Sequence, residues 1–198
     1  MGAAAGFILQ GFLDCGWQGE GLEPNPRMAD YARTELGLQV ETGTLEELQT
    51  QTHYDLLTTI QVVPHFFDLR QAFQAAGQLT KVGGFWLIET WNRNSWTARI
   101  LGQNWHEYSP PSVLHWFSPA GLQQLAAQFG FQAVARGRPQ KWINGGHAKS
   151  LLRYKLQDLK LQDLWWGRLP TWCLNLVPDN FLIPYLADDL FWMLFQRL

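Results

Sequence analysis

The chain opens with the stretch MGAAAGFILQGFL (residues 1–13), and GLEP follows at residues 21–24. A glycine-rich turn, an apolar helix, a short strand and an acidic residue at that strand's end form a nucleotide-binding unit. The glycines let backbone N–H groups approach a cofactor, and the carboxylate can accept hydrogen bonds from ribose hydroxyls. Such a turn normally follows a buried strand. Nothing precedes it here, so we expect the first strand to be missing.

Composition places the chain among globular proteins. Its 198 residues are 46% hydrophobic and 16% charged, which is enough for one domain with a sizeable core. The net charge is −2, and no run of Lys or Arg occurs, so we expect no nucleic-acid partner. Cys15 and Cys173 lie far apart in the chain. They suggest no disulfide framework, and we expect a reducing, cytoplasmic setting.

The C-terminal part of the sequence is unusually aromatic. Several of the eleven tryptophans lie late in the chain, within an apolar stretch at residues 164–195 that charges and prolines interrupt. No run reaches the ~20 apolar residues that a membrane span needs. We therefore expect no transmembrane segment. Peripheral membrane contact is an alternative, because tryptophan favours membrane interfaces.

Helix and strand patterns alternate through the first half of the chain. Helices are expected at residues 6–15, 26–36 and 69–79, and strands at 17–23, 38–42, 54–60 and 85–90, with a turn at 81–84. The YDLLTTI segment at 54–60 is typical of a buried parallel strand. This alternation predicts an α/β sandwich with a mostly parallel sheet.

The second half is less regular. We expect a helix at 118–129, a strand at 131–134, a helix at 143–161 and a final buried strand at 190–195. Residues 92–118 are aromatic and irregular, which indicates a substrate-side loop. Residues 143–188 form a helical and aromatic insertion before the last strand. The whole chain, 1–198, is then a single domain.

The order of these motifs resembles class I S-adenosylmethionine-dependent methyltransferases, and most closely the small-molecule group that includes the ubiquinone-pathway O-methyltransferases. Five segments carry the resemblance: the turn GAAAG (2–6), Glu23 at a strand end, the pair Thr44-Leu45, QVVPH (61–65) and KVGG (81–84). The segment WHEY (105–108) resembles a part of this group near the substrate. The resemblance covers essentially the whole chain.

The resemblance implies a Rossmann-like three-layer sandwich with an antiparallel last strand. It also implies S-adenosylmethionine as the cofactor and, by position, the residues that would contact it: Gly2, Ala4, Gly6, Glu23, Thr44, Leu45 and Gln61. Ala4 replaces the middle glycine of the family's turn, and Thr44 stands where the family often has Asp. The family's acidic residue before the turn has no counterpart.

Two histidines are candidates for a catalytic base. His65 follows a strand's C-terminal end, where α/β sheets place their sites, and His106 lies in the aromatic loop. Neither lies in a zinc-binding pattern, because His106-Glu107 lacks the second histidine of His-Glu-x-x-His. We expect no metal.

The resulting hypothesis is methyl transfer from S-adenosylmethionine to a small or lipid-like acceptor, most simply an O-methylation. Two alternatives stay open. A degenerate, non-catalytic relative would explain why Ala4 and Thr44 depart from the family's usual glycine and aspartate. A nicotinamide-dependent oxidoreductase would share the glycine turn, but its usual glycine spacings do not fit. The expected absence of the first strand has three possible explanations: a start codon assigned too late, a truncation or a degenerate copy.

Overall fold

The computed structural model describes residues 1–140, 142–146, 149–150, 178–184 and 188–198. It divides the chain into two compact units. The first joins Met1–Arg138 to Asp188–Leu198, and the second is Pro139–Ala187. Each unit is described by itself below. The first carries every candidate site residue.

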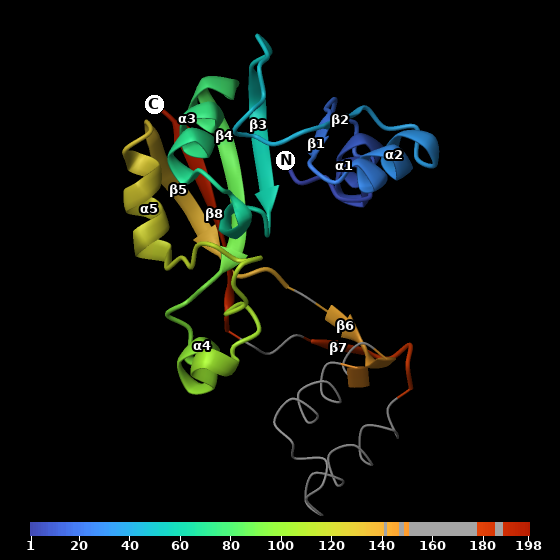
Figure 1. Ribbon diagram of the computed structural model, residues 1–198, viewed down its shortest axis with the longest axis vertical. Helices are drawn as coiled ribbons and strands as arrows, with labels where there is room; N and C mark the ends of the chain where they lie inside the picture. Colours follow the sequence, from blue (N-terminus) through green and yellow to red (C-terminus); the bar gives the residue numbers. More distant parts are fainter. Residues whose placement is uncertain (141, 147–148, 151–177, 185–187) are drawn as a thin grey trace, which may run out of the picture. The chain divides into compact units, whose positions relative to one another are not determined.

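A four-stranded sheet forms the centre of the first unit (Figure 1). Its strands are β3 (Tyr54–Ile60), β4 (Thr80–Trp91), β8 (Leu190–Arg197) and β5 (Phe131–Gly137), in the order β3-β4-β8-β5. β3 runs parallel to β4, whereas β8 runs antiparallel to both β4 and β5. The expected α/β fold and its antiparallel last strand are confirmed.

Two helices cover one face of this sheet. α3 (Leu69–Leu79) and α5 (Pro119–Ala127) share a core with the inward side chains of β4, β5 and β8. Phe73, Trp86 and Phe195 are fully buried there, and the Phe73 and Trp86 rings lie 4.8 Å apart. Each such side chain contributes about 1.5–3 kcal/mol on burial. The Trp86 indole also donates to the Thr59 hydroxyl at 3.0 Å, so its polar atom is satisfied.

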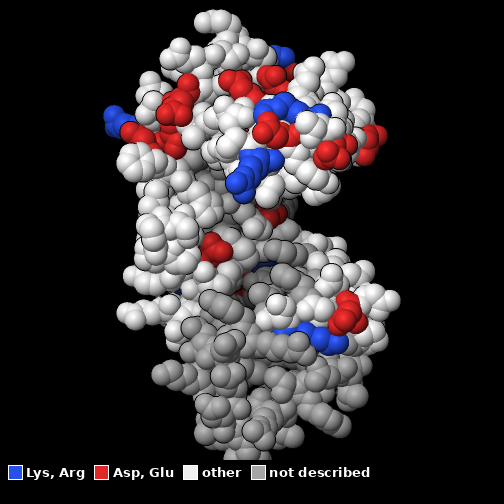
Figure 2. Space-filling model, turned by 45° about the vertical axis from the view of Figure 1, so that its right-hand side comes forward, with Lys and Arg blue, Asp and Glu red and all other residues white. Residues whose placement is uncertain are grey.

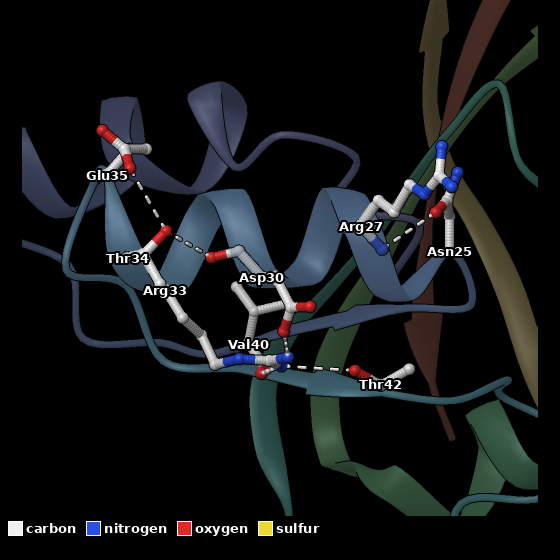
Figure 3. Close-up of polar contacts among 8 residues, drawn as sticks. All are labelled: Asn25, Arg27, Asp30, Arg33, Thr34, Glu35, Val40 and Thr42. Carbon is white, nitrogen blue, oxygen red and sulfur yellow. Dashed lines mark hydrogen bonds and ion pairs between the residues drawn. The ribbon is translucent and has the colours of Figure 1, made fainter.

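A smaller parallel sheet carries the acidic strand end. β1 (Gly21–Glu23) pairs with β2 (Val40–Thr42), and α2 (Pro26–Thr34) packs on them through Ala29 and Ala32. The Asn25 side chain caps α2 by accepting from the Arg27 N–H at 3.0 Å (Figure 3).

Arg33, from the last turn of α2, ties the helix to β2. Its guanidinium donates to the Val40 carbonyl at 2.6 Å and to the Thr42 hydroxyl at 3.2 Å (Figure 3). It also pairs with Asp30 on its own helix. These contacts hold α2 and the small sheet together, so that the position of Glu23 is determined by both.

α1 (Phe7–Asp14) follows the glycine turn and ends where Gly16 adopts a left-handed φ of +86°. None of its residues is fully buried. Leu9 and Leu13 pack partly against the small core beneath α2, while Phe7 and Ile8 are 65% and 53% exposed. The apolar face expected for this helix is therefore only partly covered.

A slot separates the two sheets along β1 and β3. Two small cavities, of about 110 and 90 Å³, both border Gly21, Tyr54, Leu56 and Thr58. A hydrogen bond from the Tyr54 hydroxyl to Glu20 crosses the slot. Only one face of β3 is deeply buried, because its side chains alternate between buried and half-buried. β3 is parallel to β4 as expected, but only Leu57 and Thr59 are buried, and the strand ends its sheet at the slot.

Other differences from the expected elements have local causes. Residues 81–84 belong to β4, where Gly83 takes a φ of +80° and the pairing with β3 shifts register, so the expected turn is an irregularity within a strand. β1 begins at Gly21 instead of residue 17. Residues 143 and 144 lie in strand β6, not in a helix, and residues 151–161 lie outside the described residues.

The second unit is described only in part. β6 (Trp142–Asn144) pairs antiparallel with β7 (Leu182–Pro184), and Lys149 forms an ion pair with Asp179 at 2.8 Å. Most of the expected insertion at 143–188 lies outside the described residues. None of the helices described in either unit is both long enough and apolar enough to cross a bilayer.

Candidate functional site

The glycine turn (residues 2–6) has the backbone that its composition indicates. Gly2 has a φ of +64°, and a Cβ at this position would lie 2.3 Å from a Val62 methyl carbon. Gly6 has a φ of +91°, and a Cβ there would meet Leu38 at 2.5 Å. Both positions therefore require glycine, for conformation and for space. The turn lies against the segments that follow β3 and precede β2.

Glu23 links this turn to the end of β1. Its carboxylate accepts from the Ala4 N–H at 2.7 Å and from the Asn25 N–H at 2.9 Å, and the residue is only 8% exposed. Each bond uses a different carboxylate oxygen. A carboxylate offers about four acceptor positions, so Glu23 retains capacity for further donors.

Gln61 follows β3 in a strained conformation. Its φ is +59°, and among the described residues only Ala4, at +48°, is another non-glycine residue with a positive φ. The Gln61 N–H donates to the Glu89 carbonyl at 2.8 Å, and its side-chain amide donates to the Glu89 carboxylate at 3.3 Å. Such strain costs about 1–3 kcal/mol per residue and concentrates at functional sites. Both strained residues are among those expected to contact the cofactor.

A cavity of about 230 Å³ brings four of the expected residues together: Gly2, Thr44, Leu45 and His65. Leu45 also belongs to the main core and is 2% exposed. The Thr44 hydroxyl donates to Glu47 at 3.0 Å. Leu22 and Pro24, on either side of Glu23, border the same cavity. Gly6 instead packs toward Leu38 and the core beneath α2.

His65 is held by the aromatic loop. Its Nδ1 lies 2.6 Å from the Ser112 carbonyl, which can only accept, so Nδ1 carries the proton in this contact. In the neutral ring Nε2 is then an acceptor. Nearby, the N–H groups of Leu114 and His115 both donate to the Pro64 carbonyl, at 2.9 and 3.1 Å. This anchors the loop beside the cavity.

His106 lies in a separate aromatic and acidic cluster and does not line the 230 Å³ cavity. Its ring stands edge-on to Trp91 at 4.5 Å. Its Nε2 is 3.5 Å from a Glu107 carboxylate oxygen, and its Nδ1 is 3.9 Å from Asp189. The structure thus places the two candidate bases in different surroundings.

Asp188 fixes the start of α4 (Trp96–Leu101) within the aromatic loop. Its carboxylate accepts from the Trp96 N–H at 2.8 Å, the Thr97 N–H at 2.9 Å and the Thr97 hydroxyl at 2.8 Å. Desolvation raises the pKa of Asp188, but the hydrogen bonds from Thr97 and Trp96 outweigh it and hold the pKa below its usual value. The loop is therefore anchored by the segment directly before β8.

Sequence reasoning missed Glu89 and Asp189. Glu89 is the acidic residue of β4 and follows its apolar run at residues 85–88, and Asp189 belongs to an acidic pair directly before β8. Burying a charged side chain costs free energy unless the charge is paired, so an acidic residue in or beside a buried strand indicates a polar partner. This pattern could have identified both residues. Each lies beside a residue that the sequence did single out, Gln61 and His106 respectively.

Neither the surface charge nor the metal-ligating residue types indicate a further ligand. Acidic and basic side chains are interspersed on the face drawn in Figure 2, with no stripe of one sign. Within the described ranges, no group of three or more His, Cys, Asp or Glu residues is placed to hold a metal ion.

The fold of this chain is similar to that of solved SAM-dependent methyltransferases. A SAM-dependent methyltransferase of Thermotoga maritima has a TM-score of 0.64 at 19% identity, with all of this chain and 80% of that one covered. A SAM-dependent methyltransferase of Archaeoglobus fulgidus has a TM-score of 0.63 at 14% identity, with 99% and 83% covered. The backbone arrangement is therefore that of SAM-dependent methyltransferases.

Sequence comparison gives the family. The ubiquinone biosynthesis O-methyltransferase of Rhodopseudomonas palustris (strain BisB18) is 26% identical over 129 residues, which span 63% of this chain and 48% of the relative. That of Nitrobacter winogradskyi is 27% identical, with 63% and 47% covered. The chain thus spans about half the length of these relatives. The family model described as a methyltransferase domain matches residues 1–136, and the chain belongs to this family.

Proposed function

We propose that the protein transfers a methyl group from S-adenosylmethionine to a hydroxyl group of a small or lipid-like acceptor. The observation that carries the proposal is the arrangement around Glu23, whose carboxylate joins the glycine turn to the strand end and keeps free acceptor capacity. The strained backbones of Ala4 and Gln61 and the cavity beside Gly2 support it.

These residues fit the cofactor. Glu23 would accept from the ribose hydroxyls, Thr44 and Leu45 would bracket the adenine, and Gly2, Ala4, Gly6 and Gln61 would line its path. The cavity, at about 230 Å³, lies below the ~300 Å³ at which sites for whole small molecules begin, so it suits part of the cofactor. When bound, S-adenosylmethionine supplies a methyl group already activated by the sulfonium charge.

The protein then has two tasks, to align the acceptor and to hold its proton. A positioned acceptor oxygen gains most of its rate from proximity and orientation. His65, with Nε2 free to accept when the ring is neutral, and His106, beside two carboxylates, are our candidates for the proton acceptor. The exposed Trp96 and Ile100 of α4 could contact an apolar acceptor. The same two side chains could also contact a membrane surface, so the proposal includes peripheral membrane contact.

The exposed Cys15 fits a reducing compartment such as the cytoplasm.

The direct test uses S-adenosylmethionine with a tritiated methyl group and a panel of hydroxylated aromatic acceptors with and without an alkyl tail. Transfer of tritium to an acceptor supports the proposal, and loss of transfer in Glu23→Ala ties it to this site. Saturable NADH binding without adenosylhomocysteine binding would instead favour the oxidoreductase. Adenosylhomocysteine binding without transfer to any acceptor would favour the non-catalytic alternative.

A further inference from the structure

Glu46 follows the Thr44-Leu45 pair and lines the same cavity of about 230 Å³. One oxygen of its carboxylate accepts from the Phe67 N–H at 3.0 Å, and its carbonyl accepts from the Gln71 side-chain amide at 2.8 Å. These contacts tie the segment after β2 to the start of α3. A carboxylate offers about four acceptor positions, so Glu46 retains capacity for a donor from a ligand in the cavity.

Phe67 also lines this cavity, yet its side chain is 91% exposed, the highest value among the large apolar residues that the structure describes. Its backbone is fixed on both sides. Glu46 holds its N–H, the carbonyl of the buried Phe66 accepts from His115 Nε2 at 2.9 Å, and Asp68 caps α3. An aromatic ring is therefore presented to solvent beside the cavity from an ordered backbone.

The cavity suits a flat, largely apolar ring that carries an amino group. Most of the side chains that line it are apolar, namely Met1, Leu22, Pro24, Leu45, Val62, Phe66 and Phe67. A purine presents apolar faces to such side chains and its exocyclic amino group at one edge. A carboxylate accepts from an amino group more strongly than a neutral hydroxyl does, and the Thr44 hydroxyl already donates to Glu47 at 3.0 Å. Glu46 supplies that carboxylate.

We propose that Glu46 and Phe67 determine which base of the cofactor is accepted. The second oxygen of Glu46 accepts from the exocyclic amino group of adenine, and the Phe67 ring stacks on a face of the purine. This inference rests on the proposed function, in which Glu23 accepts from the ribose of the same cofactor.

The first test compares two ligands that differ at the amino group. Adenosylhomocysteine and S-inosylhomocysteine, which has an oxo group in place of the amino group, are titrated calorimetrically into the full chain. Wild type should bind S-inosylhomocysteine at least about tenfold more weakly, because a carboxylate repels the oxo oxygen. In Glu46→Gln the two affinities should come within about threefold, because an amide can accept from the amino group or donate to the oxo group.

Glu47→Gln is the matched control. Glu47 is the neighbouring carboxylate, is exposed and is not among the residues that line the cavity, and its glutamine variant keeps an acceptor for Thr44. Its preference for adenosylhomocysteine should equal that of wild type. Equal affinities of wild type for the two ligands would overturn the proposal, whether or not the variants fold. A wild-type preference in folded Glu46→Gln would overturn it as well, since another group would then recognise the amino group.

The second test concerns the ring. Phe67→Ala should weaken both ligands at least about fivefold and leave the preference between them unchanged, whereas Phe67→Trp should keep wild-type affinity. Phe7→Ala is the control, because Phe7 is 65% exposed and is not among the residues that line the cavity. Wild-type affinity in Phe67→Ala would overturn the stacking role. A folded wild type that binds neither ligand would reject the proposed function, whereas one that binds both alike would reject only the present inference.

Discussion

The carboxylate of Glu23 accepts a hydrogen bond from the backbone N–H of Ala4 at 2.7 Å, across 19 residues of sequence. This contact makes the end of β1 part of the glycine turn before α1. It also fixes one oxygen of a side chain whose other oxygen is held by Asn25 at 2.9 Å. The turn and the acidic strand end are thus one structural element.

Glu23→Gln should weaken both the site and the fold. An amide presents one acceptor oxygen and one NH₂ group, so one of the two backbone N–H donors loses its acceptor. We expect adenosylhomocysteine affinity to fall at least about tenfold and the free energy of unfolding to fall by about 1–3 kcal/mol. Calorimetry and urea unfolding measure the two effects. Glu41→Gln, an exposed change on the neighbouring strand, is the control. Equal affinities for Glu23→Gln and wild type would show that the carboxylate is not a ligand.

Ala4→Gly should stabilise the protein. Ala4 has a φ of +48°, which costs an L-residue about 1–2 kcal/mol and glycine almost nothing. The added freedom of the unfolded chain cancels part of this, so the net gain should be up to about 1 kcal/mol. Ala5→Gly, at a residue without a positive φ, should destabilise by about 0.4–1 kcal/mol. Thermal unfolding followed by circular dichroism measures both variants, and the same sign for both would mean that Ala4 is not strained.

Asp188 should contribute stability that depends on pH. Its pKa in the folded chain lies below the usual value of 3.8, so the contribution is present above about pH 4 and is lost as the pH falls through the lower folded value. Asp188→Ala should therefore cost about 1–2 kcal/mol at neutral pH, and the difference from wild type should shrink as the pH falls below 3.8.

Asp55→Ala is the control for Asp188. Asp55 pairs with Lys81 at 2.8 Å, but its side chain is 79% exposed, and such pairs contribute little. Urea unfolding over a pH series gives the comparison. A cost for Asp188→Ala that is independent of pH would mean that its carboxylate does not hold α4 through its charge.

Tyr54 should remain protonated to unusually high pH. Desolvation and the hydrogen bond to Glu20 raise the pKa of the Tyr54 phenol to about 12. Ultraviolet titration of phenolate should show one of the five tyrosines ionising near that value. Glu20→Gln should bring this ionisation down toward the usual value of about 10. Identical curves for Glu20→Gln and wild type would mean that the contact across the slot between the sheets does not form.

The sequence predicted the fold where local patterns are strong. β3 and α3 begin and end at the expected residues, because apolar periodicity and the Asp68 cap define them locally. The 81–84 segment was misassigned, since two glycines suggest a turn while pairing with β3 keeps the segment in a strand. Pairing partners are distant in sequence, and local propensity does not report them.

Gly2 and Gly6 were predictable from the glycine-rich turn, and the structure gives the physical reason, since both have left-handed φ values and close neighbours. Asp189 was not, because its significance depends on Trp105 and His106, more than 80 residues earlier in the chain. Polar contacts of that separation arise from the folding of the loop onto the sheet edge, which no local pattern encodes.

Glu23 and the glycine turn together form the proposed site of the nucleoside cofactor. Calorimetric titration of adenosylhomocysteine into the folded 198-residue chain tests this most directly. We expect saturable binding with a dissociation constant on the order of micromolar, about −8 kcal/mol, and loss of this binding in Glu23→Ala. A chain that is folded by circular dichroism, yet shows no saturable binding at millimolar adenosylhomocysteine, would contradict it.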